Sequence, residues 1–117
     1  GIIMSSLTAD IYNPKVIRST MGSIYRVPFV IVADLPKAVD ILREDGITCF
    51  AAHLNGELYN SGTLTKDCAL LIGNEANGLS DEVANKADKL IKIPMAGKVE
   101  SLNAAIATSI LMYEATR

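Results

Sequence analysis

Apolar residues in this chain come in short runs, and segments with the spacing of amphipathic helices separate these runs. Residues 27–33 and 68–72 are the longest apolar stretches. Both have the length of one strand and fall short of the roughly 18–20 residues of a membrane span. Residues 69–72 are wholly apolar, which is typical of a strand inside a parallel sheet. The alternation predicts an α/β fold with a mainly parallel sheet flanked by helices.

The composition limits both the class of protein and the number of domains. A length of 117 residues suits one domain, so residues 1–117 are expected to form a single domain. Half of the residues are apolar, which excludes an intrinsically disordered chain. A net charge of −2 is unlike that of a self-sufficient nucleic-acid-binding domain, unless a local patch or a further domain supplies positive charge. Cys49 and Cys68 form no CxxC motif and are interpreted as reduced core residues of a cytosolic protein.

Polar capping residues and glycines indicate where the helices begin and end. Asn13 opens a helix that runs to about Met21, and a second helix lies between Asp34 and Gly46. A short third helix begins at Ser80. Strands are expected at residues 1–4, where the strand is interpreted as buried, and at 47–52, 69–72 and 90–93, with a turn at residues 55–56. In the run 24–32, Pro28 is expected to separate an approach segment from a strand.

The last helix is expected to begin at Ser101, as its N-cap, and to reach about Glu114. It is apolar on nearly every side, which is typical of a buried helix. The residues predicted to form its core-facing stripe are Leu102, Ile106, Ile110 and Tyr113.

The first candidate ligand loop is residues 73–78, with the sequence GNEANG, directly after a predicted strand. Glu75 stands where a dinucleotide-binding fingerprint has a glycine, and its carboxylate would repel a pyrophosphate. The loop therefore speaks against an NAD-type Rossmann site. Taken alone, it is also compatible with a plain strand-to-helix turn.

Two further segments are candidates, each with an ordinary structural alternative. Residues 93–103 lead from a strand through a Pro- and Gly-containing loop into the last helix, and their backbone groups suit an adenine edge or a ribose, or form an ordinary loop and cap. Arg18 suits a phosphate or carboxylate, or lies on a solvated helix face. His53, the only histidine, is interpreted as a surface or satisfied residue. The sequence contains no metal-ligand cluster and no assignable Ser-His-Asp set, so no metal is expected.

Read together and in order, three motifs resemble the SpoU/TrmH branch of the SPOUT RNA methyltransferases. They are NPKVIRSTMG at residues 13–22, LIGNEANGL at 71–79, and IKIPM followed by ESLNAA at 91–95 and 100–105. The resemblance covers nearly the whole chain. It implies transfer of a methyl group from S-adenosylmethionine to a ribose 2′-hydroxyl of rRNA or tRNA. It also implies a deep trefoil knot, corresponding here to residues 69–117.

The same resemblance assigns roles to individual residues. The positions expected to contact the cofactor are Gly73, Ile93, Met95, Leu102 and Ala105. Those expected around the reaction centre, as catalytic residues, are Glu75, Ser101 and Asn103, and those expected to contact RNA are Arg18 and Asn74. A sulfonium cofactor is cationic, so a loop that carries a carboxylate is compatible with it.

The chain departs from the family at its N-terminus. Family members carry an earlier Asn and Arg on a first strand and helix, whereas this sequence begins at Gly1. The chain is therefore expected to be the C-terminal part of an enzyme that homodimerises at full length, and to transfer little or no methyl alone. The alternative is a non-catalytic knotted α/β module for binding or dimerisation. An unrelated nucleotide-binding domain is disfavoured by Glu75.

Overall fold

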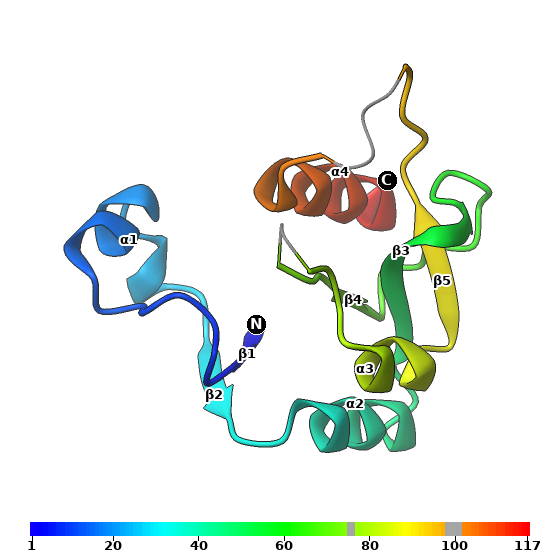
Figure 1. Ribbon diagram of the computed structural model, residues 1–117. Coiled ribbons are helices and arrows are strands. Elements are labelled where there is room, and N and C mark those ends of the chain that lie inside the picture. Colours follow the sequence, from blue (N-terminus) through cyan, green and yellow to red (C-terminus); the bar gives the residue numbers. More distant parts are fainter. Residues whose placement is uncertain (75–76, 98–101) are drawn as a thin grey trace. The chain divides into compact units, whose positions relative to one another are not determined.

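The computed structural model describes residues 1–74, 77–97 and 102–117 (Figure 1). The chain divides into two compact units, residues 1–38 and 39–117, which are described in turn. Within the described residues, no helix combines the length and apolar character needed to cross a membrane.

The first unit is built on two parallel strands, β1 (Ile2–Ser5) and β2 (Phe29–Val32), which pair in register from Ile2 with Phe29 to Ser5 with Val32. Parallel strands need a long connection, and here it contains the helix α1 (Pro14–Ser19) and the 3₁₀ turn η1 (Ser23–Tyr25). The expectation that the first strand is buried is wrong, because Ile2 is 53% and Ile3 is 39% exposed.

The ends of α1 follow from local chemistry. The Asn13 side chain accepts a hydrogen bond from the Lys15 backbone N–H at 2.9 Å, as expected of an N-cap. The helix ends at Ser19, earlier than predicted, because Met21 (φ 50°) and Gly22 (φ 87°) adopt left-handed backbone conformations that a helix cannot contain. Before Pro28 the chain forms η1, and β2 begins directly after it at Phe29, so Pro28 divides the run 24–32 as the sequence predicts.

Helix α2 (Leu35–Glu44) spans the boundary between the units and agrees with the sequence pattern. The Asp34 carboxylate accepts a hydrogen bond from the Lys37 N–H at 3.1 Å at its start. Gly46, with a φ of 83°, lies just beyond its end. Val39 is the buried residue of this helix.

The second unit contains a parallel three-stranded sheet in the order β4 (Cys68–Leu71), β3 (Thr48–Leu58) and β5 (Lys89–Lys92). On one face, Phe50 and Ile91 form a core with Leu111 of helix α4 (Ala104–Thr116). Side chains alternate along a strand, so Cys49 and Ala51, both fully buried, point to the other face.

Helices α2 and α3 (Asp81–Lys86) cover that other face and lie side by side (Figure 1). The Lys86 ammonium donates to the Asp40 carboxylate at 2.8 Å and so joins the two helices. Ser80 caps α3 by accepting from the Val83 N–H at 3.3 Å, as the sequence predicts. Val83 is the buried residue of α3.

Strand β3 is longer than predicted, and the expected turn at residues 55–56 lies inside it. Ala52 and Glu57 both pair with Ile91, so the four intervening residues are extruded from the ladder. Gly56 closes this bulge: it is buried, and a Cβ at this position would overlap the backbone of Ile91. The Asn-Gly pair is thus a bulge signal here, not a hairpin signal.

The sequence misplaced both the start and the inward face of α4. Asn103 is its N-cap, accepting from the Ala105 and Ile106 N–H groups at 2.9 and 3.3 Å, whereas Ser101 lies outside the described residues. Leu111 and Ala115 face the core, whereas Ile106 is 54% and Tyr113 is 72% exposed. Because the helix is apolar nearly all round, its periodicity does not show which face is buried. The face that packs on the sheet is the one that carries small alanines.

Candidate functional site

A pocket of about 470 Å³ opens at the carboxyl edge of the three-stranded sheet. Residues at or just after the ends of the paired segments line it: Ala52 of β3, Gly73 after β4 and Ile93 after β5. The start of α4 forms a further wall. The carboxyl ends of parallel strands are where open α/β folds bind ligands, because the loops there diverge and leave a crevice.

The lining of this pocket is mostly apolar, with a few polar side chains. The larger apolar side chains come from β3, β5, α4 and the segments after β4 and β5: Leu54, Ile72, Leu79, Ile91, Ile93, Met95, Leu102 and Leu111. The polar ones are His53, Asn74, Asn77, Asp81 and Lys92. An apolar body with a few convergent polar groups is the usual composition of a small-molecule site.

Two hydrogen bonds to Asn74 connect the ends of the loop after β4. The Gly78 N–H donates to the Asn74 carbonyl at 2.9 Å, and the Asn77 N–H donates to the Asn74 side chain at 2.7 Å. A Cβ at Gly73 would overlap the backbone of Gly78 and Leu79. Glycine at position 73 is therefore required by the loop itself, before any ligand is considered.

Five of the residues that the sequence singled out line this one pocket: Gly73, Asn74, Ile93, Met95 and Leu102. Ala105 is exposed and does not line it, whereas its neighbour Ala104 does. The Asn103 side-chain oxygen is engaged as the cap of α4. Arg18 belongs to the first unit. Glu75 and Ser101, two of the expected catalytic residues, lie outside the described residues.

Other lining residues were missed by the sequence patterns. His53 and Leu54 line the pocket from the β3 bulge, and Asp81 and Ala107 line it from helices. The sequence offers one signal for His53 and Leu54, which is their position. They directly follow the predicted strand 47–52, at the same edge of the sheet as Gly73 and Ile93.

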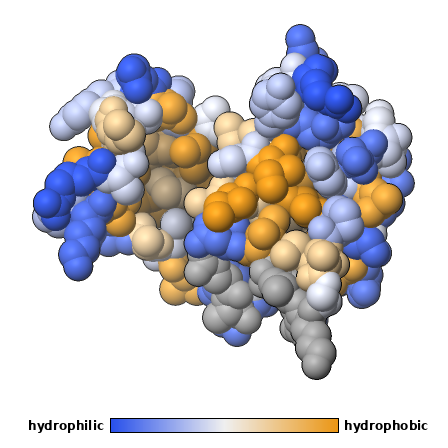
Figure 2. All heavy atoms as spheres, turned by 90° about the horizontal axis from the view of Figure 1, so that it is seen from above, coloured by the Kyte–Doolittle hydropathy of each residue, from blue (hydrophilic) through white to orange (hydrophobic). Residues whose placement is uncertain are grey.

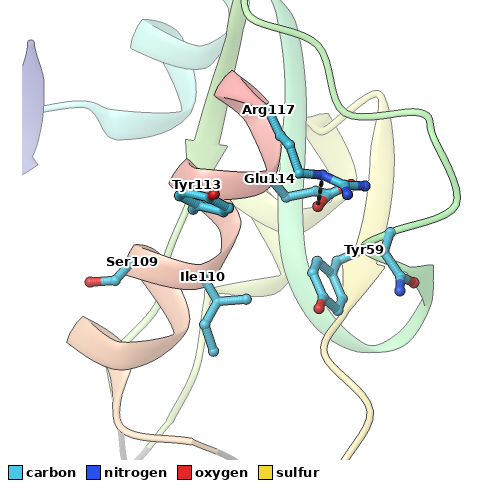
Figure 3. A pocket seen from close by; sticks show the side chains of 7 residues that line it. Tyr59, Ser109, Ile110, Tyr113, Glu114 and Arg117 are labelled. Atoms are coloured by element: carbon cyan, nitrogen blue, oxygen red, sulfur yellow. Dashed lines mark hydrogen bonds and ion pairs between the residues drawn. The ribbon is translucent and has the colours of Figure 1, made fainter.

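A second pocket of about 470 Å³ lies between α4 and the segment after β3 (Figure 3). Ile110 and Tyr59 face one another across it, and the Glu114–Arg117 ion pair, at 3.2 Å, borders it. None of the residues expected from the sequence to be functional lines this pocket. In the described ranges, no three His, Cys, Asp or Glu side chains are grouped so that they could hold a metal ion.

Comparison with known proteins identifies the family. The model of the SpoU rRNA Methylase family matches residues 1–113. The chain belongs to this family. The resemblance to SpoU/TrmH enzymes expected from the motifs is therefore confirmed.

Members of the SpoU family resemble the chain in sequence as well as in structure. The chain is 35% identical over 97% of its length to the 23S rRNA (guanosine(2553)-2′-O)-methyltransferase RlmP of Bacillus subtilis and spans 46% of that protein. The SpoU methyltransferase AviRb from Streptomyces viridochromogenes, solved in complex with the cofactor AdoMet, matches 98% of the chain with a TM-score of 0.88 and 35% identity; 48% of AviRb is covered. A TrmH/SpoU tRNA-modifying enzyme from A. aeolicus matches 99% of the chain at a TM-score of 0.83 and 30% identity, with 60% of that enzyme covered. The chain thus spans about half the length of the curated relatives it matches.

Proposed function

We propose that this chain is the cofactor-binding part of an S-adenosylmethionine-dependent methyltransferase that acts on ribose 2′-hydroxyls of rRNA or tRNA. The observation that carries the proposal is the convergence of Gly73, Ile93, Met95 and Leu102 on one pocket. Gly73 follows β4, whereas Ile93, Met95 and Leu102 belong to the connection between β5 and α4 of a SpoU-family chain. The relatives support the reaction class: RlmP is named as a 2′-O-methyltransferase, and one solved neighbour as an RNA 2′-O ribose methyltransferase.

The pocket fits the proposed cofactor in size and polarity. A volume of about 470 Å³ lies within the usual range of small-molecule sites. The apolar side chains of the lining suit an adenine ring, and Asn77 is available to polar groups. Asp81, which also lines the pocket, is compatible with a cationic sulfonium, as it would not be with a phosphate. When bound, S-adenosylmethionine would supply the methyl group.

The chain's own residues would hold and orient the reactants. We assign Gly73, Ile93, Met95 and Leu102 to the cofactor, and leave out Ala105 because it does not line the pocket. We assign Arg18 and Asn74 to the RNA, and Glu75, Ser101 and Asn103 to the reaction centre. Methyl transfer requires the attacking oxygen, the methyl carbon and the sulfur in line, so positioning supplies much of the rate. Asn103 also caps α4, so a substitution there needs a separate check of folding.

We also propose that residues 69–117 form the trefoil knot of the family and that the full-length protein is a homodimer. The outer face of α4 supports the second point, because Ile106 and Met112 are 54% and 57% exposed. Apolar side chains gather on the face of the molecule where α4 lies (Figure 2). A cytoplasmic location follows from the proposed RNA substrate.

Two neighbouring alanines on α4 test the cofactor assignment. Ala104→Leu extends a side chain into the pocket and should weaken binding of S-adenosylhomocysteine about tenfold or more, because it occupies ligand volume. Ala105→Leu adds the same volume on the exposed side and should leave the affinity unchanged. Titration calorimetry measures both, and thermal unfolding checks the fold.

The opposite result would redirect the proposal. Equal affinities for Ala104→Leu and the parent chain would place the cofactor elsewhere. A loss confined to Ala105→Leu would restore the sequence-based role of Ala105 and contradict the pocket. No binding by the parent chain would favour the non-catalytic binding or dimerisation module.

A further inference from the structure

His53 occupies an unusual place in the sheet. β3 pairs with β5 up to Ala52, leaves the ladder, and pairs with the same residue, Ile91, again at Glu57. His53 is the first residue of the extruded segment and lines the pocket beside the strand ends. The proposed function assigns it no role.

The histidine ring is oriented from within the bulge. The backbone N–H of Asn55 donates a hydrogen bond to Nδ1 of His53 at 3.1 Å. A nitrogen that accepts a hydrogen bond carries no hydrogen, so the hydrogen of the neutral ring is on Nε2. Within the described parts of the chain, no acceptor for this Nε2–H is recorded. The backbone thus sets the tautomer of a histidine that lines the pocket, with Nε2 as its hydrogen-bond donor.

The bulge that presents His53 is fixed at its far end. Gly56 lies so close to the Ile91 backbone that no larger residue fits. Directly after β3, the Tyr59 N–H donates to the Lys92 carbonyl at 2.9 Å, so the chain beyond the bulge is again hydrogen-bonded to β5. A donor held by a rigid backbone loses little freedom when it binds, so its hydrogen bond contributes to affinity with little entropic cost.

We propose that His53 is a binding residue whose Nε2–H donates to an oxygen of the cofactor, either a ribose hydroxyl or the carboxylate of the amino-acid tail. This inference rests on the proposed function, because it requires S-adenosylmethionine or its product in the pocket. Both oxygens accept the same donor. Two ligands distinguish them, since 5′-methylthioadenosine keeps the ribose but has no carboxylate.

The first test uses the chain without substitution. His53 is the only histidine, so long-range ¹H–¹⁵N spectra contain one imidazole that needs no assignment. The spectrum should show hydrogen on Nε2 and none on Nδ1, and S-adenosylhomocysteine should shift the Nε2 signal. An Nδ1-protonated ring, or an Nε2 signal that does not move at saturating ligand, would overturn the inference.

The second test uses His53→Ala with a neighbouring control. His53→Ala should weaken S-adenosylhomocysteine about threefold to tenfold, the usual effect of one lost hydrogen bond. Asn55→Ala keeps the backbone N–H that orients the ring, and its exposed side chain does not line the pocket, so affinity should not change. A weakening shared by 5′-methylthioadenosine assigns the acceptor to the ribose, and one confined to S-adenosylhomocysteine assigns it to the carboxylate.

Failure of this inference differs from failure of the proposed function. If S-adenosylhomocysteine binds His53→Ala and the parent chain equally, the role of His53 is wrong while the pocket stands. If the parent chain binds neither ligand, both are wrong.

Discussion

At the scale of single residues, Asp88 joins three parts of the second unit. One carboxylate oxygen accepts from the Arg43 guanidinium at 3.0 Å, and the other accepts from the Cys49 N–H at 2.8 Å. The Asp88 backbone N–H donates to the Cys49 carbonyl at 2.8 Å. One side chain before β5 thereby connects α2 to the start of β3. Its hydrogen bond to a buried strand contributes more than its half-exposed ion pair.

The two cysteines are predicted to remain reduced and slow to react. Cys49 pairs with Ala69, and Cys68 with Thr48, so their thiols lie on opposite faces of the sheet. Burial raises the pKa of both thiols, and Asp88 raises that of Cys49 further while Arg43 lowers it. At pH 8 the native chain should therefore react several-fold more slowly with a disulfide reagent than the unfolded chain. A disulfide-linked monomer after mild oxidation would contradict this placement.

At the scale of elements, α4 shows how packing selects one side of a uniformly apolar helix. Small residues at Ala104 and Ala107 lie on the same side as the buried Leu111. This side contacts β4 and also lines the candidate pocket. The same element therefore provides part of the core and one wall of the site.

Substitutions on opposite sides of α4 should differ in their effect on the free energy of unfolding. Leu111 is 1% exposed, so Leu111→Ala should cost about 2–5 kcal/mol through lost burial and a cavity. Ile106→Ala, at a position 54% exposed, should change stability by less than about 0.5 kcal/mol. Chemical denaturation at a concentration where the chain is monomeric measures both. A larger loss of stability for Ile106→Ala than for Leu111→Ala would show that the buried face is the stripe predicted from the sequence.

At the scale of the whole molecule, the candidate pocket lies within residues 39–117, whereas the chain spans about half of the relatives it matches. The ribose hydroxyl is a weak nucleophile at neutral pH, and a general base typically contributes about 10²–10⁴-fold. The resemblance to SpoU/TrmH enzymes implies that the group with that role belongs to an earlier segment of the family pattern than the ones matched here. A net charge of −2 also provides little attraction for a polyanion.

The chain alone is accordingly predicted to bind cofactor but to transfer methyl groups at least about 100-fold more slowly than a version extended upstream. Tritiated S-adenosylmethionine with unmodified ribosomal RNA and bulk tRNA measures this. A matched calorimetric titration shows whether both versions bind the cofactor. Equal turnover by the two versions would place the activating group within these residues, and Arg18 would then be the first to substitute.

Local signals in the sequence determined much of this protein. Asn13, Asp34 and Ser80 accept hydrogen bonds from the first turns of their helices, and the order of strands and helices follows the apolar runs. The spacing of the Gly73 loop and of residues 91–105 was sufficient to indicate the family. These signals are readable because capping and strand formation depend on neighbours a few residues away.

Tertiary structure alone decided which face of α4 is buried, that Asn55 and Gly56 form a bulge, and that His53 reaches the pocket. Each depends on a partner far away in sequence: Leu111 on Phe50, Gly56 on the Ile91 backbone, and His53 on the neighbouring strand ends. When a helix is apolar nearly all round, the spacing of its apolar residues does not indicate which face is buried. An Asn-Gly pair is equally compatible with a turn and a bulge until a second strand passes beside it.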